Sequence, residues 1–316
     1  MTKEEIKIKL DAVLSRLGMD VTVWSETVSF FLAKLELLSN TSNYNELLKS
    51  LFASNDLSEF NSYVFEAMFA YDFESKQQSL AYEINQLSDE NSSVDFYYIL
   101  DDLKVYFELR LIQQRNWITS SIKTQLSANK SSEMLLNGND ETDETIRIQN
   151  LILSKCQKSD GIPTKFHTPE NDTLNFIVIN ISELHLGMID KFDCLLTMYG
   201  DVGVPLFFRR GIFGMWQDLP ENSSEIERRC YGKFQHFRET IHGIFFVRYA
   251  KGSGCLNKMY IDRELEYFVI LNNNLLQKET VDHVITKLAL FLTKWADNAS
   301  GQPDRGKLNG AVGGGH

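Results

Sequence analysis

The stretch that decides the fold is VDFYYILDDLKVYFELRLIQ, residues 94–113, in which a polar turn at Asp101 and Asp102 separates two runs rich in apolar residues. Side chains in both runs alternate with a period of two, as they do in β-strands, so the sequence predicts an antiparallel hairpin. A symmetric turn pairs positions whose numbers add up to 203. This register places Asp95 directly opposite Glu108, and two carboxylates therefore become cross-strand neighbours.

The opposed acids define a polar face of the predicted hairpin. The Cβ atoms of directly opposed residues lie roughly 5 Å apart, so two carboxylates repel each other there unless a cation lies between them. Alternation places Arg110 on the same face as Glu108. Two interpretations stay open: a metal site, or an ion pair between Arg110 and one acid on a sheet surface, which contributes little to stability. The other face is apolar and consists of Phe96, Tyr98, Val105, Phe107 and Leu109.

Helical and strand-like periodicity extends on both sides of the hairpin and predicts an α/β fold with a mixed sheet and an N-terminal helical extension. We expect residues 1–55 to form the helical extension, residues 56–298 an elaborated α/β domain, and residues 299–316 a flexible Gly-rich tail. The predicted helices cover residues 2–17, 24–38, 44–52, 58–73, 117–125, 143–157, 189–198 and 281–295. The predicted strands cover residues 80–84, 94–99, 104–112, 176–181, 244–249 and 260–271.

The charge of the chain is distributed unevenly. Its 316 residues contain 32 Lys and Arg against 43 Asp and Glu, a formal net charge of −11. Residues 1–102 contain 18 acids against 7 bases, whereas residues 103–165 contain 7 acids against 9 bases. Tight non-specific binding of phosphate depends on cationic surfaces, so the acidic N-terminal part is not expected to wrap nucleic acid. A basic surface after Leu103 stays open.

Cysteine spacing and hydropathy indicate the cellular compartment in which the protein is expected. No C-x-x-C pair is present, which argues against a zinc ribbon or a disulfide scaffold and for reduced thiols. No apolar run approaches the length needed to span a membrane, and the N-terminus lacks a basic patch followed by an apolar run. We therefore expect a soluble, cytoplasmic protein without membrane contacts. The cysteines are Cys156, Cys194, Cys230 and Cys255.

The hairpin, the helix before it and the αβ elements after it resemble the PD-(D/E)XK nuclease superfamily over roughly residues 58–181. Asp95 matches the aspartate of the family, and Glu108 matches the acid of its acid-x-Lys triplet. Val94 replaces the proline that names the motif, and Arg110 replaces the lysine. The chain thus resembles a divergent bacterial member, and the resemblance implies a restriction-endonuclease-like mixed sheet flanked by helices.

The resemblance also implies a metal-dependent phosphodiesterase in which Asp95 and Glu108 hold Mg²⁺, or Mn²⁺, and Arg110 stabilises the charge of the phosphate. Oxygen ligands suit Mg²⁺, which polarises a phosphoryl oxygen and supplies hydroxide near neutral pH. Arginine binds phosphate with a planar fork but does not accept a proton, so its presence here points to lowered or absent activity. Glu66 or Glu83 would be the accessory carboxylate of the family. For Glu66, a solvated helix face is the alternative interpretation.

Cations that follow the hairpin in the sequence predict a rim that contacts phosphates. The predicted nucleic-acid-binding residues are Arg115, Lys123 and Arg147, together with Gln149, which lies in a helix where some nuclease families carry a site glutamine. A solvated face is the alternative interpretation for each cation. The same stretch also contains Trp117, Lys130, Lys155 and Lys165.

Two functions stay open. The first is a Mg²⁺-dependent nuclease that acts on DNA or, second in order, RNA. The second is a catalytically inactive nuclease-fold protein that binds a protein partner or forms a homodimer through the arginine-rich and aromatic-rich middle of the chain. That middle includes Arg209-Arg210, Arg228-Arg229 and Trp216. Further on, Gly252-Ser253-Gly254 predicts the turn of a second hairpin.

Overall fold

The computed structural model of the chain describes residues 1–19, 25–85, 93–128, 138–156, 165–166, 168–184, 189–201, 211–215, 221–250, 264–275 and 278–295. Several features singled out in the sequence lie outside the described residues: Lys130, the Arg209-Arg210 pair, Trp216, the expected turn at Gly252-Ser253-Gly254, Cys255 and the Gly-rich tail. Within the described part, every helix is too short or too polar to cross a membrane.

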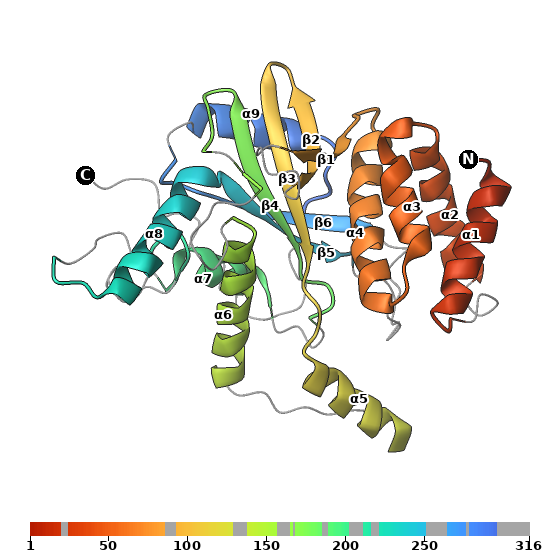
Figure 1. Ribbon diagram of the computed structural model, residues 1–316, viewed down its shortest axis with the longest axis horizontal. Coiled ribbons are helices and arrows are strands. Elements are labelled where there is room, and N and C mark those ends of the chain that lie inside the picture. The colour runs from red at the N-terminus through yellow and green to blue at the C-terminus, as the bar shows by residue number, and fades with distance from the viewer. Residues whose placement is uncertain are drawn as a thin grey trace.

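A six-stranded mixed sheet forms the centre of the molecule, and its strands lie side by side in sequence order (Figure 1). The first three strands form an antiparallel meander, the third to fifth run parallel, and the sixth is antiparallel to the fifth. The molecule is therefore an α/β fold with an open sheet. The strands are β1 (Ala81–Asn85), β2 (Ser93–Leu100), β3 (Leu103–Leu111), β4 (Thr173–Asn180), β5 (Gly243–Tyr249) and β6 (Leu265–Leu271).

The hairpin of β2 and β3 has the predicted register, with Phe96 opposite Phe107. Asp101 opens the turn with a φ of 53°, a left-handed conformation that aspartate adopts more readily than most residues. Asp95 on β2 and Glu108 on β3 lie one position beyond this pair, and their carboxylates are close enough to interact electrostatically.

Helices from the N-terminal part cover one face of the sheet and share one hydrophobic core with it (Figure 1). The helix next to the sheet is α4, whose Phe69 ring lies 5.3 Å from Phe107 and 5.4 Å from Phe96 between centroids. The preceding helices pack into the same core, so the described residues of the range 1–55 are continuous with the α/β part in packing. These helices are α1 (Lys3–Arg16), α2 (Ser25–Ser39), the 3₁₀ turn η1 (Ser42–Tyr44), α3 (Asn45–Ala53) and α4 (Leu57–Glu74), and α9 (Lys278–Leu288) joins them on this core.

A second hydrophobic core fills the opposite face of the sheet, between β4, β5 and three helices. Ile177 of β4 and Phe246 of β5 point into it, and both are fully buried. α5 (Asn116–Ala128) extends away from the body below this layer (Figure 1), and Ile118 is its buried residue. The covering helices are α6 (Gly138–Ser154), α7 (Lys191–Tyr199) and α8 (Glu225–Thr240).

α8 is a helix that the sequence analysis did not predict, since no predicted helix lies between residues 198 and 281. The helix begins with a capping box, in which the Ser224 hydroxyl accepts a hydrogen bond from the Glu227 N–H and the Glu227 carboxylate accepts one from the Ser224 N–H. Its apolar side chains are few, and Phe234 and Phe237 bury it against the second core. A largely polar sequence therefore forms a helix here through its cap and a narrow apolar stripe.

The last helix is shorter than the predicted range of residues 281–295, because α9 ends at Leu288. The chain after it returns to the edge strand β6. There the Tyr267 N–H donates to the Thr293 carbonyl at 2.8 Å, and the Trp295 N–H donates to the Tyr267 carbonyl at 3.0 Å. Backbone hydrogen bonds with β6 thus replace the helical ones that the sequence predicted for these residues.

A partly buried hydrogen bond connects α4 with β6, since the Tyr267 hydroxyl donates to Oδ2 of Asp72 at 2.6 Å. Burial raises the pKa of Asp72 to about 7, although this hydrogen bond opposes the shift. The folded protein therefore keeps a proton on Asp72 at pH values at which the unfolded chain, with a pKa of 3.8, has released it.

We expect the contribution of Asp72 to the free energy of unfolding to fall as the pH rises from about 4 to about 7, because the folded state binds more protons than the unfolded chain in this window. Asp72→Asn keeps an acceptor for Tyr267 but does not titrate, so its Tm should decrease less over the same window. Calorimetry at a series of pH values measures this. Asp101→Asn, at a side chain that is 64% exposed, is the control. An unchanged pH dependence in Asp72→Asn would contradict the assignment.

Candidate active site

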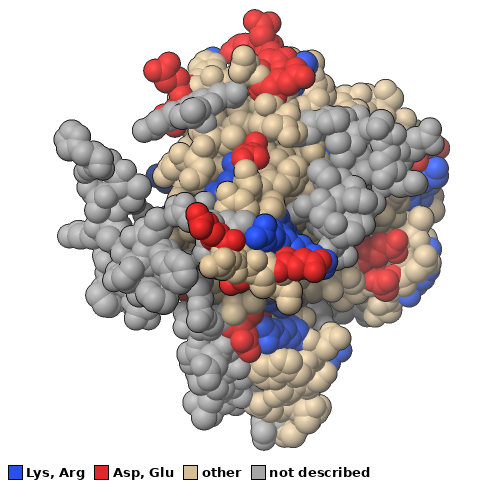
Figure 2. Space-filling model, turned by 60° about the vertical axis from the view of Figure 1, so that its left-hand side comes forward, with Lys and Arg blue, Asp and Glu red and all other residues tan. Residues whose placement is uncertain are grey.

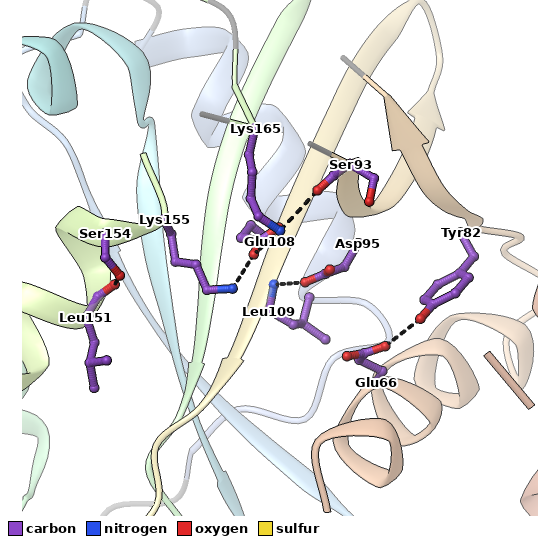
Figure 3. Close-up of polar contacts among 10 residues, drawn as sticks. All are labelled: Glu66, Tyr82, Ser93, Asp95, Glu108, Leu109, Leu151, Ser154, Lys155 and Lys165. Carbon is purple, nitrogen blue, oxygen red and sulfur yellow. Dashed lines mark hydrogen bonds and ion pairs between the residues drawn. The ribbon is translucent and has the colours of Figure 1, made fainter. Parts of the chain in front are cut away.

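Three acidic side chains gather beside the β-meander (Figure 3): Glu66 of α4, Asp95 of β2 and Glu108 of β3. A small pocket of about 100 Å³ lies next to them, and Glu66 and Asp95 form part of its wall. The fold therefore brings both predicted metal ligands and one predicted accessory acid into the same region. The pocket is lined by Ser62, Phe65, Glu66, Asp95, Leu109, Arg110, Leu111 and Lys155.

Glu108 is a fully buried carboxylate that two lysines bind. Nζ of Lys165 lies 2.8 Å from Oε1 and 2.9 Å from Oε2 of Glu108, and Lys155, directly after α6, forms an ion pair with Oε1. Burial lowers the pKa of Lys165, but the carboxylates of Glu108 and Asp95 outweigh this effect, and the pKa of Lys165 is raised overall. Two cations therefore compensate the buried charge of Glu108.

Asp95 connects the two strands of the hairpin through its side chain. Its Oδ2 accepts a hydrogen bond from the Leu109 N–H at 2.6 Å, which satisfies a backbone donor of β3. Burial raises the pKa of Asp95 to about 7, the Glu108 carboxylate adds to the increase, and Lys165 and Lys155 oppose it. Near neutral pH, a cation that binds Asp95 must therefore compete with a proton.

Glu66 is the third acid, and it is half-buried on α4. The Tyr82 hydroxyl of β1 donates a hydrogen bond to Oε2 of Glu66 at 2.8 Å (Figure 3). Burial raises the pKa of Glu66 well above its usual range, and the carboxylate of Asp95 is the next cause. The alternative interpretation of Glu66 as part of a solvated helix face does not fit this environment.

Two further predicted site residues lie at the border of the group. Arg110 is exposed and lines the pocket. The sequence left open an ion pair between Arg110 and Glu108 or Asp95. In the structure, Lys155 and Lys165 form the ion pairs with Glu108. Glu83 is exposed on the edge strand β1, in a left-handed conformation with a φ of 51°. Of the two predicted accessory acids, Glu66 is the one that lines the pocket.

Arg115 and Arg147, which were predicted to contact nucleic acid, both pair with the same buried acid. Nε of Arg115 lies 2.8 Å from Oε2 of Glu144, and Nε of Arg147 donates to Oε1 at 2.7 Å. Arg147 also donates to the carbonyl of Gln113 at 3.0 Å. These two arginines therefore attach α6 to the segment between β3 and α5. Their positive charge partly compensates the negative charge of the buried Glu144.

The other two predicted nucleic-acid-binding residues lie apart from each other. Gln149 is buried and donates to the carbonyl of Thr197 at 2.9 Å, so it connects α6 with α7. Lys123 is exposed on α5. On the face shown in Figure 2, Lys and Arg side chains lie in small groups beside Asp and Glu.

The donor set suits a divalent cation held by two carboxylates. Asp95 and Glu108 provide hard oxygen ligands. The pKa of Asp95 is raised first by burial and then by the Glu108 carboxylate, and a bound cation would favour the charged form of Asp95. No set of three or more His, Cys, Asp or Glu side chains within the described ranges is arranged to hold a metal ion. Mg²⁺ commonly uses one or two carboxylates and completes its coordination with water and substrate phosphates. The site fits an ion of that kind.

Lys155, Lys165 and Tyr82 are the residues of this site whose contacts the sequence analysis missed. The two lysines reach Glu108 across 47 and 57 positions of the chain. The sequence held only a weak signal for these contacts. Lys155 ends a predicted helix that comes after the strand with Glu108, but this indicates a contact only if the helix packs on the face of the sheet to which Glu108 points. Comparisons of the chain with protein-family models, curated proteins and solved structures found no match.

Proposed function

We propose that the protein is a Mg²⁺-dependent phosphodiesterase that acts on nucleic acid, with DNA as the first expected substrate and Mn²⁺ as a substitute ion. The observation that carries this proposal is the pocket formed by Glu66, Asp95 and Lys155 directly beside the buried Glu108. Carboxylates suit Mg²⁺, and an ammonium group suits a phosphate. A restriction-endonuclease-like sheet is part of the proposal, and the meander that carries Asp95 and Glu108 on adjacent strands supports it.

Each residue of the site has one role in this proposal. Asp95 and Glu108 hold the ion, which when bound polarises a phosphoryl oxygen and lowers the pKa of a coordinated water. Lys155 lines the pocket and stabilises the negative charge that develops on the phosphate. Glu66, whose pKa is raised by burial and by Asp95, is placed to exchange a proton with water in the pocket. The exposed Arg110 binds phosphate groups next to the reacting one.

We expect cleavage of nucleic acid to require added Mg²⁺ or Mn²⁺ and to stop when EDTA is present, because the carboxylates alone neither polarise a phosphate nor supply hydroxide near neutral pH. Metal-stripped protein is titrated with each ion against single-stranded, duplex and structured DNA and against RNA of the same sequence, and products are separated on gels. Cleavage at an unchanged rate in EDTA would contradict the proposal.

A matched pair of lysine variants controls this experiment. Lys155→Met removes the cation that lines the pocket and should reduce cleavage at saturating metal by at least about tenfold. Lys104→Met removes a lysine of β3 that forms an exposed ion pair with Asp172 and should leave the rate unchanged. Equal losses in both variants would indicate general damage to the fold.

The double pairing of Glu108 favours a second candidate function. If Lys155 and Lys165 are permanent partners of Glu108, the buried acid is a structural ion pair and the protein is a catalytically inactive nuclease-fold binding module. This function predicts neither metal-dependent cleavage nor metal binding at the site, together with a protein partner or self-association. Light scattering during size-exclusion chromatography and the metal titration above distinguish the two functions.

A further inference from the structure

The carboxylate of Glu108 is occupied at both oxygens by a single ammonium group. Nζ of Lys165 lies 2.8 Å from Oε1 and 2.9 Å from Oε2, and Lys155 adds a contact at Oε1. A carboxylate that binds a metal ion through both oxygens presents the same two atoms to the ion. Because Glu108 is 0% exposed, an incoming cation has to use positions that these ammonium groups hold.

The two lysines have different surroundings. Lys155 lines the pocket, whereas Lys165 also donates to the Ser93 carbonyl at 3.1 Å, at the beginning of β2 (Figure 3). Lys165 has a φ of 65°, in the left-handed region that residues with side chains rarely adopt. Such a conformation persists where surrounding contacts maintain it. Lys165 is therefore held at Glu108 by its contacts rather than by a relaxed backbone.

We propose that Lys165 is an internal cation that competes with a divalent metal ion for Glu108, so that the ion binds only when the Lys165 side chain moves away from this carboxylate. The inference rests on the proposed metal-dependent function and names the residue that sets its metal affinity. An ammonium group and a divalent ion at one fully buried carboxylate repel each other strongly. The Ser93 carbonyl gives Nζ a hydrogen-bond partner that does not depend on Glu108.

Mn²⁺ binding to the full chain without nucleic acid tests this inference, because electron paramagnetic resonance counts the free ion and requires no activity. We expect Lys165→Met to tighten Mn²⁺ binding by at least about tenfold, since a positive charge next to the ligand is removed. Lys165→Arg keeps the charge and should bind like the unaltered protein, as should Lys104→Met. Asp95→Asn is added to each of these variants. The Mn²⁺ that still binds then measures the ions held elsewhere on this acidic molecule.

A measurement on the unaltered protein keeps the test valid if Lys165→Met does not fold. We expect saturating Mn²⁺ to increase the acylation of Lys165 by an amine-specific reagent at least about twofold, because an ammonium group that leaves its carboxylate becomes more accessible. Mass spectrometry of the digested protein gives this rate for each lysine. Acylation of Lys104, whose partner Asp172 lies outside the site, is expected to stay constant.

The outcomes separate this inference from the proposed function. Unchanged or weaker Mn²⁺ binding in folded Lys165→Met overturns the inference even if the protein cleaves nucleic acid, as does an acylation rate of Lys165 that does not rise with Mn²⁺. Tighter binding in Lys165→Met supports the inference even if no nucleic acid is cleaved, and in that case the proposed function fails alone. If neither protein binds Mn²⁺ at the site, the inference is also wrong.

Discussion

Glu108→Gln is expected to lower the free energy of unfolding by roughly 2–4 kcal/mol, because it leaves two lysine side chains next to a buried neutral group. The side chains of Lys155 and Lys165 are 17% and 26% exposed, so part of the lost pairing is recovered when they turn towards solvent. Urea unfolding at neutral pH in EDTA measures the loss without interference from metal ions.

A double variant distinguishes the cost of leaving lysine side chains without their carboxylate from other effects of Glu108→Gln. Glu108→Gln combined with Lys165→Met removes one of the two ammonium groups that Glu108→Gln leaves without a carboxylate, so we expect it to be more stable than Glu108→Gln alone. Asp172→Asn breaks the exposed pair with Lys104 and should cost far less than Glu108→Gln, which makes it the matched control. A cost for Glu108→Gln as small as that of Asp172→Asn would show that the buried cluster does not support the fold.

Asp95→Asn is expected to reduce metal-dependent cleavage by at least about 100-fold while the protein stays folded. Asparagine keeps an oxygen that accepts the hydrogen bond from the Leu109 N–H, but it has no negative charge for a cation. It also removes a carboxylate whose pKa burial and Glu108 raise to about 7. Stability near neutral pH should therefore stay equal or increase, as often happens when a functional residue is replaced.

Cleavage rates at saturating Mg²⁺ and thermal unfolding of the same preparations test both halves of this expectation. Asp101→Asn, in the exposed turn of the same hairpin, is the control for the loss of one carboxylate. Retained cleavage in Asp95→Asn would remove this residue from the metal site. Loss of cleavage together with a large drop in Tm would instead assign Asp95 a structural role.

The hairpin could be predicted from sequence because everything that determines it is local. Its register depends on the turn at Asp101 and on the alternation of side chains within residues 94–113, and the structure has Phe96 opposite Phe107 as this alternation requires. The position of Asp95 and Glu108 on adjacent strands follows from the same short stretch. The α/β order of elements was predictable for a similar reason, since each period is visible within one element.

The partners of Glu108 could not be predicted in this way. Lys155 reaches it because α6 packs against the sheet, and Lys165 reaches it from a position shortly before β4 in the sequence. No sequence period connects residues that far apart. From the sequence, Lys155 and Lys165 could therefore be named only among the cations that follow the hairpin. For Arg110, alternation predicted the face of the strand on which it lies. Alternation could not predict that Arg110 is exposed and that Lys155 and Lys165 contact Glu108.

The unusual backbone of Glu83 has a consequence for the behaviour of the protein at high concentration. Glu83 lies in the middle of β1, which is an edge strand, and its φ of 51° departs from the extended conformation. An interrupted and charged edge is a poor template for a strand from another molecule, so this border of the sheet resists intermolecular β-pairing and aggregation.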